Sequence, residues 1–417
     1  MNIFALWIGK LTFSLLKLLG RRGAALPGLL VEKIAPGFLN AYLSRLPQGV
    51  IIVVGTNGKT TTTKMLSHVL RAKYRVLTNP TGSNFTRGIV ASIVEHAQWS
   101  GALAYDIAVL ELDEAYAVKF VAQCKPRGVV VLNVMRDQMD RFAEIDQTAK
   151  LLENVAQSAR DFVVLNADDA RIAAIEKSLK VPVYTFGVSM QLRSVFLQDD
   201  ELHSGPVRVT GSAASVVLAS YKAADAVYEI GGTRFSLTLA SHGAHNAQNA
   251  GAVLAAVQAV GADMAEAVVR LSEVRPAFGR GELFTVGNKK IILQLVKNPG
   301  GFRHALLSGE QIDNKTTMVA INDDYPDGRD VSWLWDVDFS SLAGNEIITS
   351  GVRAADMALR LKYDDIQTIQ HEQGLQKSLI ALERRIKAGG VGIIYATYTA
   401  MLELRQHMAA LTEVEKV

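Results

Sequence analysis

The stretch that decides the fold is Ile51-Ile52-Val53-Val54-Gly55-Thr56-Asn57-Gly58-Lys59-Thr60-Thr61. Its aliphatic first part, counted from Val50, predicts a buried β-strand, and its run of threonines predicts the start of a helix. The glycines between them let backbone N–H groups turn inward around phosphate oxygens, and the helix N-terminus adds partial positive charge. The segment therefore predicts a phosphate-binding loop.

Residue roles follow from this geometry. Lys59 is expected between the β- and γ-phosphates of a nucleotide, while the Thr60 hydroxyl is expected to hold magnesium. The usual pattern G-x-x-x-x-G-K-[ST] has a glycine where this chain has Val53, so the match is partial. A glycine turn that binds nothing would not need a lysine followed by threonines. The predicted binding residues are Gly55, Thr56, Asn57, Gly58, Lys59, Thr60 and Thr61.

Composition sets the class of protein. The chain has 417 residues, of which 49% are hydrophobic and 20% charged, with a net charge of +3. This length allows two or three domains, and the charge balance requires no nucleic-acid partner. The single cysteine, Cys124, excludes an intrachain disulfide and a cysteine-rich zinc site and suits a reducing compartment. We therefore expect a cytoplasmic protein.

Beyond the loop, short aliphatic runs alternate with helix-like stretches, which predicts an α/β fold with a mostly parallel sheet and ligands at the carboxyl ends of its strands. Residues 189–239 change to short strand-like segments and predict an antiparallel insertion. Pro276–Glu282 is expected to be a linker, and a second α/β unit follows it. The predicted domains are an N-terminal helical segment, a central ATP-binding domain and a C-terminal α/β domain, over residues 1–45, 46–283 and 284–417.

The N-terminal segment from Asn2 to Leu19 is apolar but includes Lys10 and Lys17. A membrane span needs about 20 residues with few charges, and a secretory signal places its charges before the apolar run. The favoured interpretation is an amphipathic helix that packs on its own domain. The alternative is a helix that lies on the inner face of a membrane, near a lipid-linked substrate.

Four motifs resemble the Mur ligases and folylpolyglutamate synthetases. They are G-T-N-G-K-T-T at the loop, Asn166-Ala167-Asp168-Asp169, His245-Asn246 with Asn249, and Gly279-Arg280. The resemblance implies the fold of the Mur ligase central P-loop domain, ATP and Mg²⁺ as cofactors, and activation of a carboxylate as an acyl phosphate. It further implies that Asn246 and Asn249 read the adenine and that Arg280 stabilises charge during phosphoryl transfer. Glu111, after the strand Ile107–Leu110, is implied as a magnesium ligand, direct or through water.

Narrower motifs resemble the MurT branch of that family. They are Thr78-Asn79-Pro80-Thr81-Gly82-Ser83-Asn84, Arg136-Asp137-Gln138-Met139-Asp140-Arg141-Phe142, Lys297-Asn298-Pro299-Gly300-Gly301-Phe302, Asp327-Gly328-Arg329-Asp330-Val331-Ser332-Trp333-Leu334-Trp335-Asp336 and Thr397-Tyr398-Thr399-Ala400-Met401-Leu402-Glu403. MurT is the synthetase subunit of lipid II isoglutaminyl synthase, which amidates the α-carboxylate of D-glutamate in the peptidoglycan stem peptide. The resemblance implies a heterodimer with a GatD-like glutaminase, and lipid II or a related peptidoglycan precursor as substrate.

Ammonia from glutamine requires a cysteine nucleophile and a histidine base. Cys124 has no glycine-flanked turn to present it and is expected to be a small buried residue, so the partner would supply both groups. The resemblance implies that an aspartate of this chain completes the partner's triad. Asp330 is the preferred candidate, with Asp327 and Asp336 as alternatives; a turn or N-cap role before Ser332 is the other interpretation of Asp330.

Two departures from the family pattern affect metals. Gln138 stands where many Mur ligases have a histidine, and Glu153 falls near the position of their carbamylated lysine, so a plain carboxylate is a hypothesis for that role. MurT proteins commonly carry a four-cysteine zinc ribbon, whereas residues 189–239 contain no cysteine, and zinc is not predicted. Two other functions stay open: a Mur or folylpolyglutamate type of amino-acid ligase, and a non-catalytic nucleotide-binding partner of a glutaminase.

Overall fold

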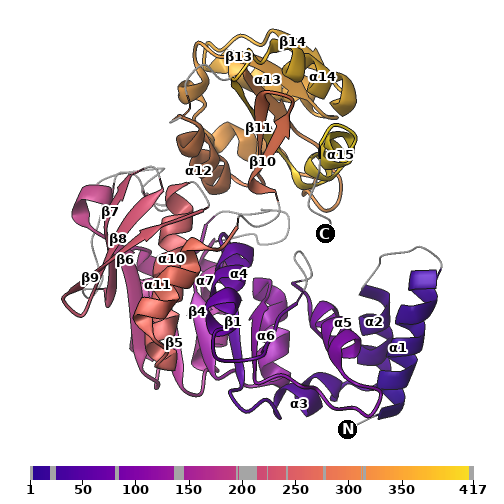
Figure 1. Cartoon of the computed structure of the whole chain (residues 1–417), viewed down its shortest axis with the longest axis vertical. Helices are drawn as coiled ribbons and strands as arrows, with labels where there is room; N and C mark the ends of the chain where they lie inside the picture. The colour runs from indigo at the N-terminus through magenta and orange to yellow at the C-terminus, as the bar shows by residue number, and fades with distance from the viewer. Residues whose placement is uncertain are drawn as a thin grey trace. The chain divides into compact units, whose positions relative to one another are not determined.

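The computed structural model describes residues 3–18, 25–79, 84–135, 145–193, 196, 214–222, 224–240, 243–275, 279–310, 312 and 316–412. The chain divides into two compact units (Figure 1). The first consists of Met1–Val134, Ile145–Leu239 and Asn246–Val274, and the second of Met135–Glu144, Ala240–His245 and Arg275–Val417. Each unit is an α/β structure with its own sheet, as predicted.

The first unit is built on a nine-stranded sheet with the order β2-β3-β1-β4-β5-β6-β7-β8-β9. Neighbouring strands pair in parallel from β2 to β7, while β7, β8 and β9 pair antiparallel. The predicted antiparallel insertion therefore extends the main sheet, because β7 pairs directly with β6. The strands are β1 (Val50–Val54), β2 (Val76–Leu77), β3 (Ile107–Glu111), β4 (Gly128–Val131), β5 (Phe162–Asn166), β6 (Val183–Val188), β7 (Val216–Lys222), β8 (Asp225–Ile230) and β9 (Thr233–Thr238).

Strand β1 lies between β3 and β4, and all five of its residues are buried. A strand covered on both faces has no solvent side, which is why its sequence is continuously aliphatic instead of alternating. The helices of this unit are α1 (Ile3–Leu18), α2 (Ala25–Ile34), α3 (Phe38–Leu43), α4 (Lys59–Leu70), α5 (Thr86–His96), α6 (Glu114–Gln123), α7 (Ile145–Gln157), α8 (Ala170–Ile175) and α11 (Met264–Ser272), together with α10 (Ala244–Val260), which begins in the second unit.

The N-terminal helix α1 packs on its own unit, as the favoured interpretation predicted. Figure 1 shows α1, α2 and α5 side by side, and the three helices contact one another. Ala5, Leu6 and Gly9 of α1 are buried, and a Cβ added at Gly9 would press on Val31 of α2 and Val94 of α5. Among the described helices, none combines the length and apolar composition needed to cross a bilayer.

The second unit has a six-stranded sheet with the order β10-β11-β15-β12-β13-β14, parallel except for the β10–β11 pair. Its strands are β10 (Arg280–Val286), β11 (Lys289–Leu295), β12 (Thr316–Ala320), β13 (Glu346–Ser350), β14 (Gln370–Glu372) and β15 (Val391–Ala396). Its helices, besides the first residues of α10, are α12 (Pro299–Glu310), α13 (Ala354–Tyr363), α14 (Leu375–Arg385) and α15 (Tyr398–Met408).

Part of the predicted linker belongs to this second sheet. Residues 276–278 lie outside the described residues, but Arg280 already begins β10, so the linker prediction was wrong for residues 280–282. Glu282 is fixed by a bidentate ion pair with Arg405 of α15, at 2.7 and 2.9 Å. The pair ties the edge strand to a helix that lies far along the chain, a contact that local sequence cannot reveal.

The contact between α2 and α5 yields a stability prediction. A Cβ added at Gly28 would overlap the backbone carbonyl of Arg87, whereas one added at Gly37 meets nothing within 4 Å. Since backbone cannot move aside as a side chain can, we expect Gly28→Ala to lower the free energy of unfolding by about 1–3 kcal/mol. Gly37→Ala is the control and should change it by less than about 0.5 kcal/mol. Denaturant unfolding measures both, and equal effects would contradict the packing described.

Candidate functional site

The predicted phosphate loop connects β1 to α4 at the carboxyl edge of the first sheet. Gly55 and Gly58 have φ values of +127° and +88°, which side chains other than glycine adopt rarely. Asn133, just after β4, braces the loop from one side: its Oδ1 accepts from the Asn57 N–H at 2.9 Å, and its Nδ2 donates to the Asn57 carbonyl at 3.0 Å. The Asn133 carbonyl also accepts from the Thr56 N–H at 3.0 Å. The loop backbone is thus held in one conformation.

Lys59 is the first residue of α4 and is buried. Its Nζ donates to the Gly55 carbonyl at 2.5 Å, to the Thr56 carbonyl at 3.3 Å and to Glu114 Oε1 at 3.0 Å. Glu114 is itself buried, as the first residue of α6. The sequence pattern singled out Glu111 within the E-L-D-E cluster and assigned no role to Glu114. The helical start after Asp113, which N-caps α6 through the Ala115 N–H, is the signal that could have found it.

Glu111 ends β3 and pairs with Val53, so it lies at the same sheet edge as the loop. It is buried, and its backbone is fixed by Asn79, which donates to the Glu111 carbonyl and accepts from the Glu111 N–H, both at 3.0 Å. Thr60 follows Lys59 in the first turn of α4. The topology therefore brings Glu111, Lys59 and Thr60 to one edge, around the glycine loop.

The donors at this edge suit Mg²⁺ bound together with phosphate. Within the described part of the chain, no group of three or more His, Cys, Asp or Glu residues is placed to hold a metal ion. Magnesium commonly binds through one or two protein oxygens and completes its shell with water and substrate phosphates. The Glu111 carboxylate and the Thr60 hydroxyl fit that mode, and an all-protein metal cage does not.

The other family motifs take different positions around the loop. Asn249, in α10, is buried against the loop, where a Cβ added at Gly58 would clash with its side-chain oxygen, and Asn246 is buried one helical turn earlier. Asp169 accepts from the Val134 N–H at 2.8 Å and caps α8, and burial raises the pKa of its carboxyl to about 6. Asn166 donates to the Leu132 carbonyl at 2.9 Å. The N-A-D-D motif thus ties β5 to the end of β4, which carries Asn133.

Three predicted features receive no test from the described residues. Arg280 begins β10, but its side chain lies outside the described residues. Gln138 lies entirely outside the described residues. Glu153 lies on α7, where its Oε1 accepts from Gln157 at 3.4 Å.

Cys124 is buried at the C-cap of α6, and desolvation raises the pKa of its thiol to about 11, so it is protonated at neutral pH and is a poor nucleophile.

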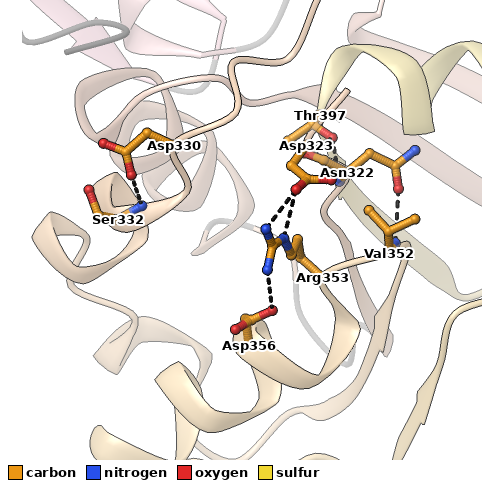
Figure 2. Close-up of polar contacts among 8 residues, drawn as sticks. All are labelled: Asn322, Asp323, Asp330, Ser332, Val352, Arg353, Asp356 and Thr397. Carbon is orange, nitrogen blue, oxygen red and sulfur yellow. Dashed lines mark hydrogen bonds and ion pairs between the residues drawn. The ribbon is translucent and has the colours of Figure 1, made fainter. Parts of the chain in front are cut away.

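A second group of predicted residues lies in the second unit. Figure 2 shows Asp330, which is exposed and accepts a hydrogen bond from the Ser332 N–H at 2.8 Å. This contact is the one that the turn interpretation of Asp330 predicted. The carboxylate of Asp330 is nevertheless exposed at the surface. Asp327 is buried instead, accepts from Thr399 N–H and Oγ1, and has a pKa raised by burial. Asp336 is exposed on the short helix Ser332–Asp336.

The segment that leads to Asp330 is fixed at its start by polar contacts. Asn322 donates its N–H to Thr397 Oγ1 at 2.8 Å, and its Oδ1 accepts from the Val352 N–H at 3.1 Å (Figure 2). Arg353 donates twice to Asp323, at 2.7 and 2.9 Å, and is also paired with Asp356 at 3.4 Å. These contacts join the ends of β12, β13 and β15 and position the loop that carries Asp330.

The tryptophans after Asp330 divide between core and surface. Trp333 packs on Phe302, with ring centroids 6.2 Å apart. Trp335 is 50% exposed and meets Tyr363 edge-on at 5.1 Å, while the buried guanidinium of Arg360 lies 5.4 Å from the centre of its ring. Tryptophan and tyrosine side chains are enriched at protein–protein interfaces.

Comparisons with known proteins agree with this architecture. The family model "Mur ligase middle domain" matches residues 53–257, and the family model "MurT ligase C-terminal" matches residues 295–401. MurF from Acinetobacter baumannii superposes with a TM-score of 0.72 at 18% identity, over 91% of this chain and 80% of that one. MurF from Thermotoga maritima, solved in complex with ADP, superposes with a TM-score of 0.67 at 16% identity, over 88% and 81% of the two chains.

The chain belongs to the Mur ligase family and is an ATP-dependent ligase. Within that family it is similar along nearly its whole length to MurT. The lipid II isoglutaminyl synthase (glutamine-hydrolyzing) subunit MurT of Staphylococcus aureus (strain COL) is 27% identical, over 97% of both chains. The MurT subunit of Streptococcus pneumoniae is 29% identical, over 98% of this chain and 97% of its own.

The geometry of the loop predicts the effect of adding a methyl group to it. Gly58 and Gly261 both have positive φ values, but a Cβ at Gly58 would clash with Asn249, while one at Gly261 meets nothing within 4 Å. Both substitutions to alanine carry backbone strain of about 1–2 kcal/mol. We expect Gly58→Ala to weaken Mg-ATP binding more than about tenfold, equivalent to about 1.4 kcal/mol, and Gly261→Ala to leave it unchanged. Calorimetric titration measures both affinities for Mg-ATP. An unaltered affinity in Gly58→Ala would show that the loop is not part of the nucleotide-binding site.

Proposed function

We propose that this chain activates the α-carboxylate of D-glutamate in the stem peptide of lipid II as an acyl phosphate and amidates it to D-isoglutamine with ammonia from a separate glutaminase subunit. The observation that carries the proposal is the braced glycine loop with Lys59 buried at its helical end and Glu111 buried at the same sheet edge. The names of the similar MurT proteins support the choice of reaction and acceptor.

In the first step, a carboxylate oxygen attacks the γ-phosphorus of ATP, and the bond to the β,γ-bridging oxygen breaks as ADP leaves. Two anions must approach each other, so catalysis depends on positive groups placed where charge develops. Lys59 would exchange its contact with Glu114 for phosphate oxygens, and the loop N–H groups would donate to them. Magnesium, held by Thr60 and Glu111, would neutralise phosphate charge.

In the second step, ammonia attacks the acyl carbon, a proton is lost, and phosphate leaves with the carboxylate oxygen that it received. Hydrolysis of glutamine to supply this ammonia needs a reactive cysteine. Cys124 is the single cysteine of the chain, and it is buried with a raised pKa. The nucleophile would therefore belong to a GatD-like partner, in keeping with the word "subunit" in the names of the similar MurT proteins.

Asp330 would orient the histidine of that partner. Its carboxylate is at the surface, one oxygen already accepts from the Ser332 N–H, and its loop is anchored by Asn322 and the Asp323–Arg353 pair. A carboxylate fixed in this way can hold an imidazole in the correct tautomer. Asp327 is unsuited, because it is buried and occupied by Thr399. The exposed pair of Trp335 and Tyr363 would contribute to the interface beside it.

The proposal is tested in the complex reconstituted with a GatD-like glutaminase. We expect Asp330→Asn to lower glutamine-dependent amidation at least about 100-fold, because the asparagine no longer holds the charged imidazole. Amidation with added ammonium chloride should be unchanged, since acyl phosphate formation uses the first unit. Asp336→Asn, at the exposed end of the short helix Ser332–Asp336, is the matched control and should retain both activities.

Two outcomes would contradict the assignment. If Asp330→Asn retains glutamine-dependent turnover, Asp330 is not part of the glutaminase centre. If an amino acid is incorporated while ammonia is not, the chain is an amino-acid ligase of the Mur or folylpolyglutamate type.

A further inference from the structure

The outer face of α1 exposes a stripe of large apolar side chains. Its members follow one another at intervals of three or four residues, which places them on one side of a helix. They are Phe4, Trp7, Leu11, Leu15 and Leu18, with exposed fractions of 67, 41, 62, 58 and 85%. Single exposed apolar residues are ordinary, but a continuous row of five along one helix requires an explanation.

Helix α1 is held on its own unit by the residues opposite the stripe and by one hydrogen bond of Trp7. Ala5, Leu6 and Gly9 are buried against the helices of the first unit. Trp7 donates from Nε1 to the Trp99 carbonyl at 2.9 Å, which fixes the helix against the loop after α5. Trp99 is 54% exposed and adds a further aromatic ring beside the stripe. One side of the helix therefore packs on the first unit, and the apolar row on its other side remains at the surface.

The two charged residues of α1 itself are both positive. Helix α1 contains Lys10 and Lys17 and no aspartate or glutamate. Lys10 Nζ lies 5.6 Å from the ring centre of Trp99, and the negative charge of Glu95 attracts the ammonium group of Lys10. Glu32, in the neighbouring α2, is engaged by the Thr86 hydroxyl at 2.7 Å, and Lys33 beside it is exposed. A surface that covers the stripe would therefore be apolar inside and negatively charged at its rim.

We propose that this face of α1 binds the surface of an anionic lipid bilayer, with the apolar row in the acyl boundary and the lysines at the headgroups. Aromatic and aliphatic residues on one face with lysines beside them are the composition of helices that lie in a membrane interface. A second copy of the chain fits less well, because α1 carries two lysines and no acidic residue, so two α1 helices packed together would bring like charges near each other. The inference does not depend on the acceptor or the nitrogen source of the proposed function.

The test is sedimentation of the full chain with vesicles. One set consists of phosphatidylcholine, and the other includes about one third phosphatidylglycerol. We expect wild type to sediment with the anionic vesicles and the bound fraction to fall, without vanishing, when salt is raised from about 0.1 M to about 0.5 M. The double variant Leu11→Glu, Leu15→Glu should bind at least about tenfold more weakly, because both side chains would enter the acyl region charged. Val269→Glu, an equally exposed site on α11, is the control and should bind like wild type.

Folding and chemistry are controlled separately. The substituted residues are exposed, so circular dichroism and ammonia-dependent amidation of a carrier-free acceptor should match wild type. The proposal is wrong if wild type stays in the supernatant with both kinds of vesicle, or if the double variant binds as wild type does. It is also wrong if the wild-type chain is a dimer in light scattering and the double variant a monomer, because the stripe would then be covered by a second copy.

Discussion

The proposed function depends on one backbone constraint: the loop between β1 and α4 must stay open to receive a polyphosphate. Two glycines with positive φ make that conformation accessible, and Asn133 fixes it with contacts to Asn57 and Thr56. Asn133 is placed in turn by β4, whose end is tied to β5 by Asn166 and Asp169. The parallel sheet thus acts as the frame that orients the N–H groups of the loop, and Lys59 receives its position from the same frame.

The two units divide the proposed chemistry between them. The first holds the nucleotide loop, the acidic end of β3 and the helix α1 with its apolar face. The second presents Asp330 and an aromatic pair at its surface, both on short segments anchored by Arg353 and Arg360. In the proposed reaction, a chain whose single cysteine is buried would need a partner to release ammonia from glutamine, and the exposed aromatic pair of the second unit would suit an interface with that partner.

Local sequence predicted the elements whose signal is local. The strand Val50–Val54 has the predicted bounds, and α4 begins within one residue of its prediction, because a buried strand, a glycine turn and a helix start are all readable in one stretch. Contacts between distant segments were not readable: Glu114 reaches Lys59 across 55 positions, Asn133 reaches Asn57 across 76, and Arg405 fixes β10 across 123. The edge strand β10 was taken partly for a linker for that reason.

The central claim is that the acceptor carboxylate becomes an acyl phosphate on this chain. Transfer of ¹⁸O tests it most directly: the acceptor is labelled with ¹⁸O in its D-glutamate α-carboxylate and amidated with ATP, magnesium and ammonia, and the inorganic phosphate is analysed by mass spectrometry. The account predicts that one labelled oxygen passes from the carboxylate to each phosphate released. Phosphate without the label, formed along with amidated product, would contradict it.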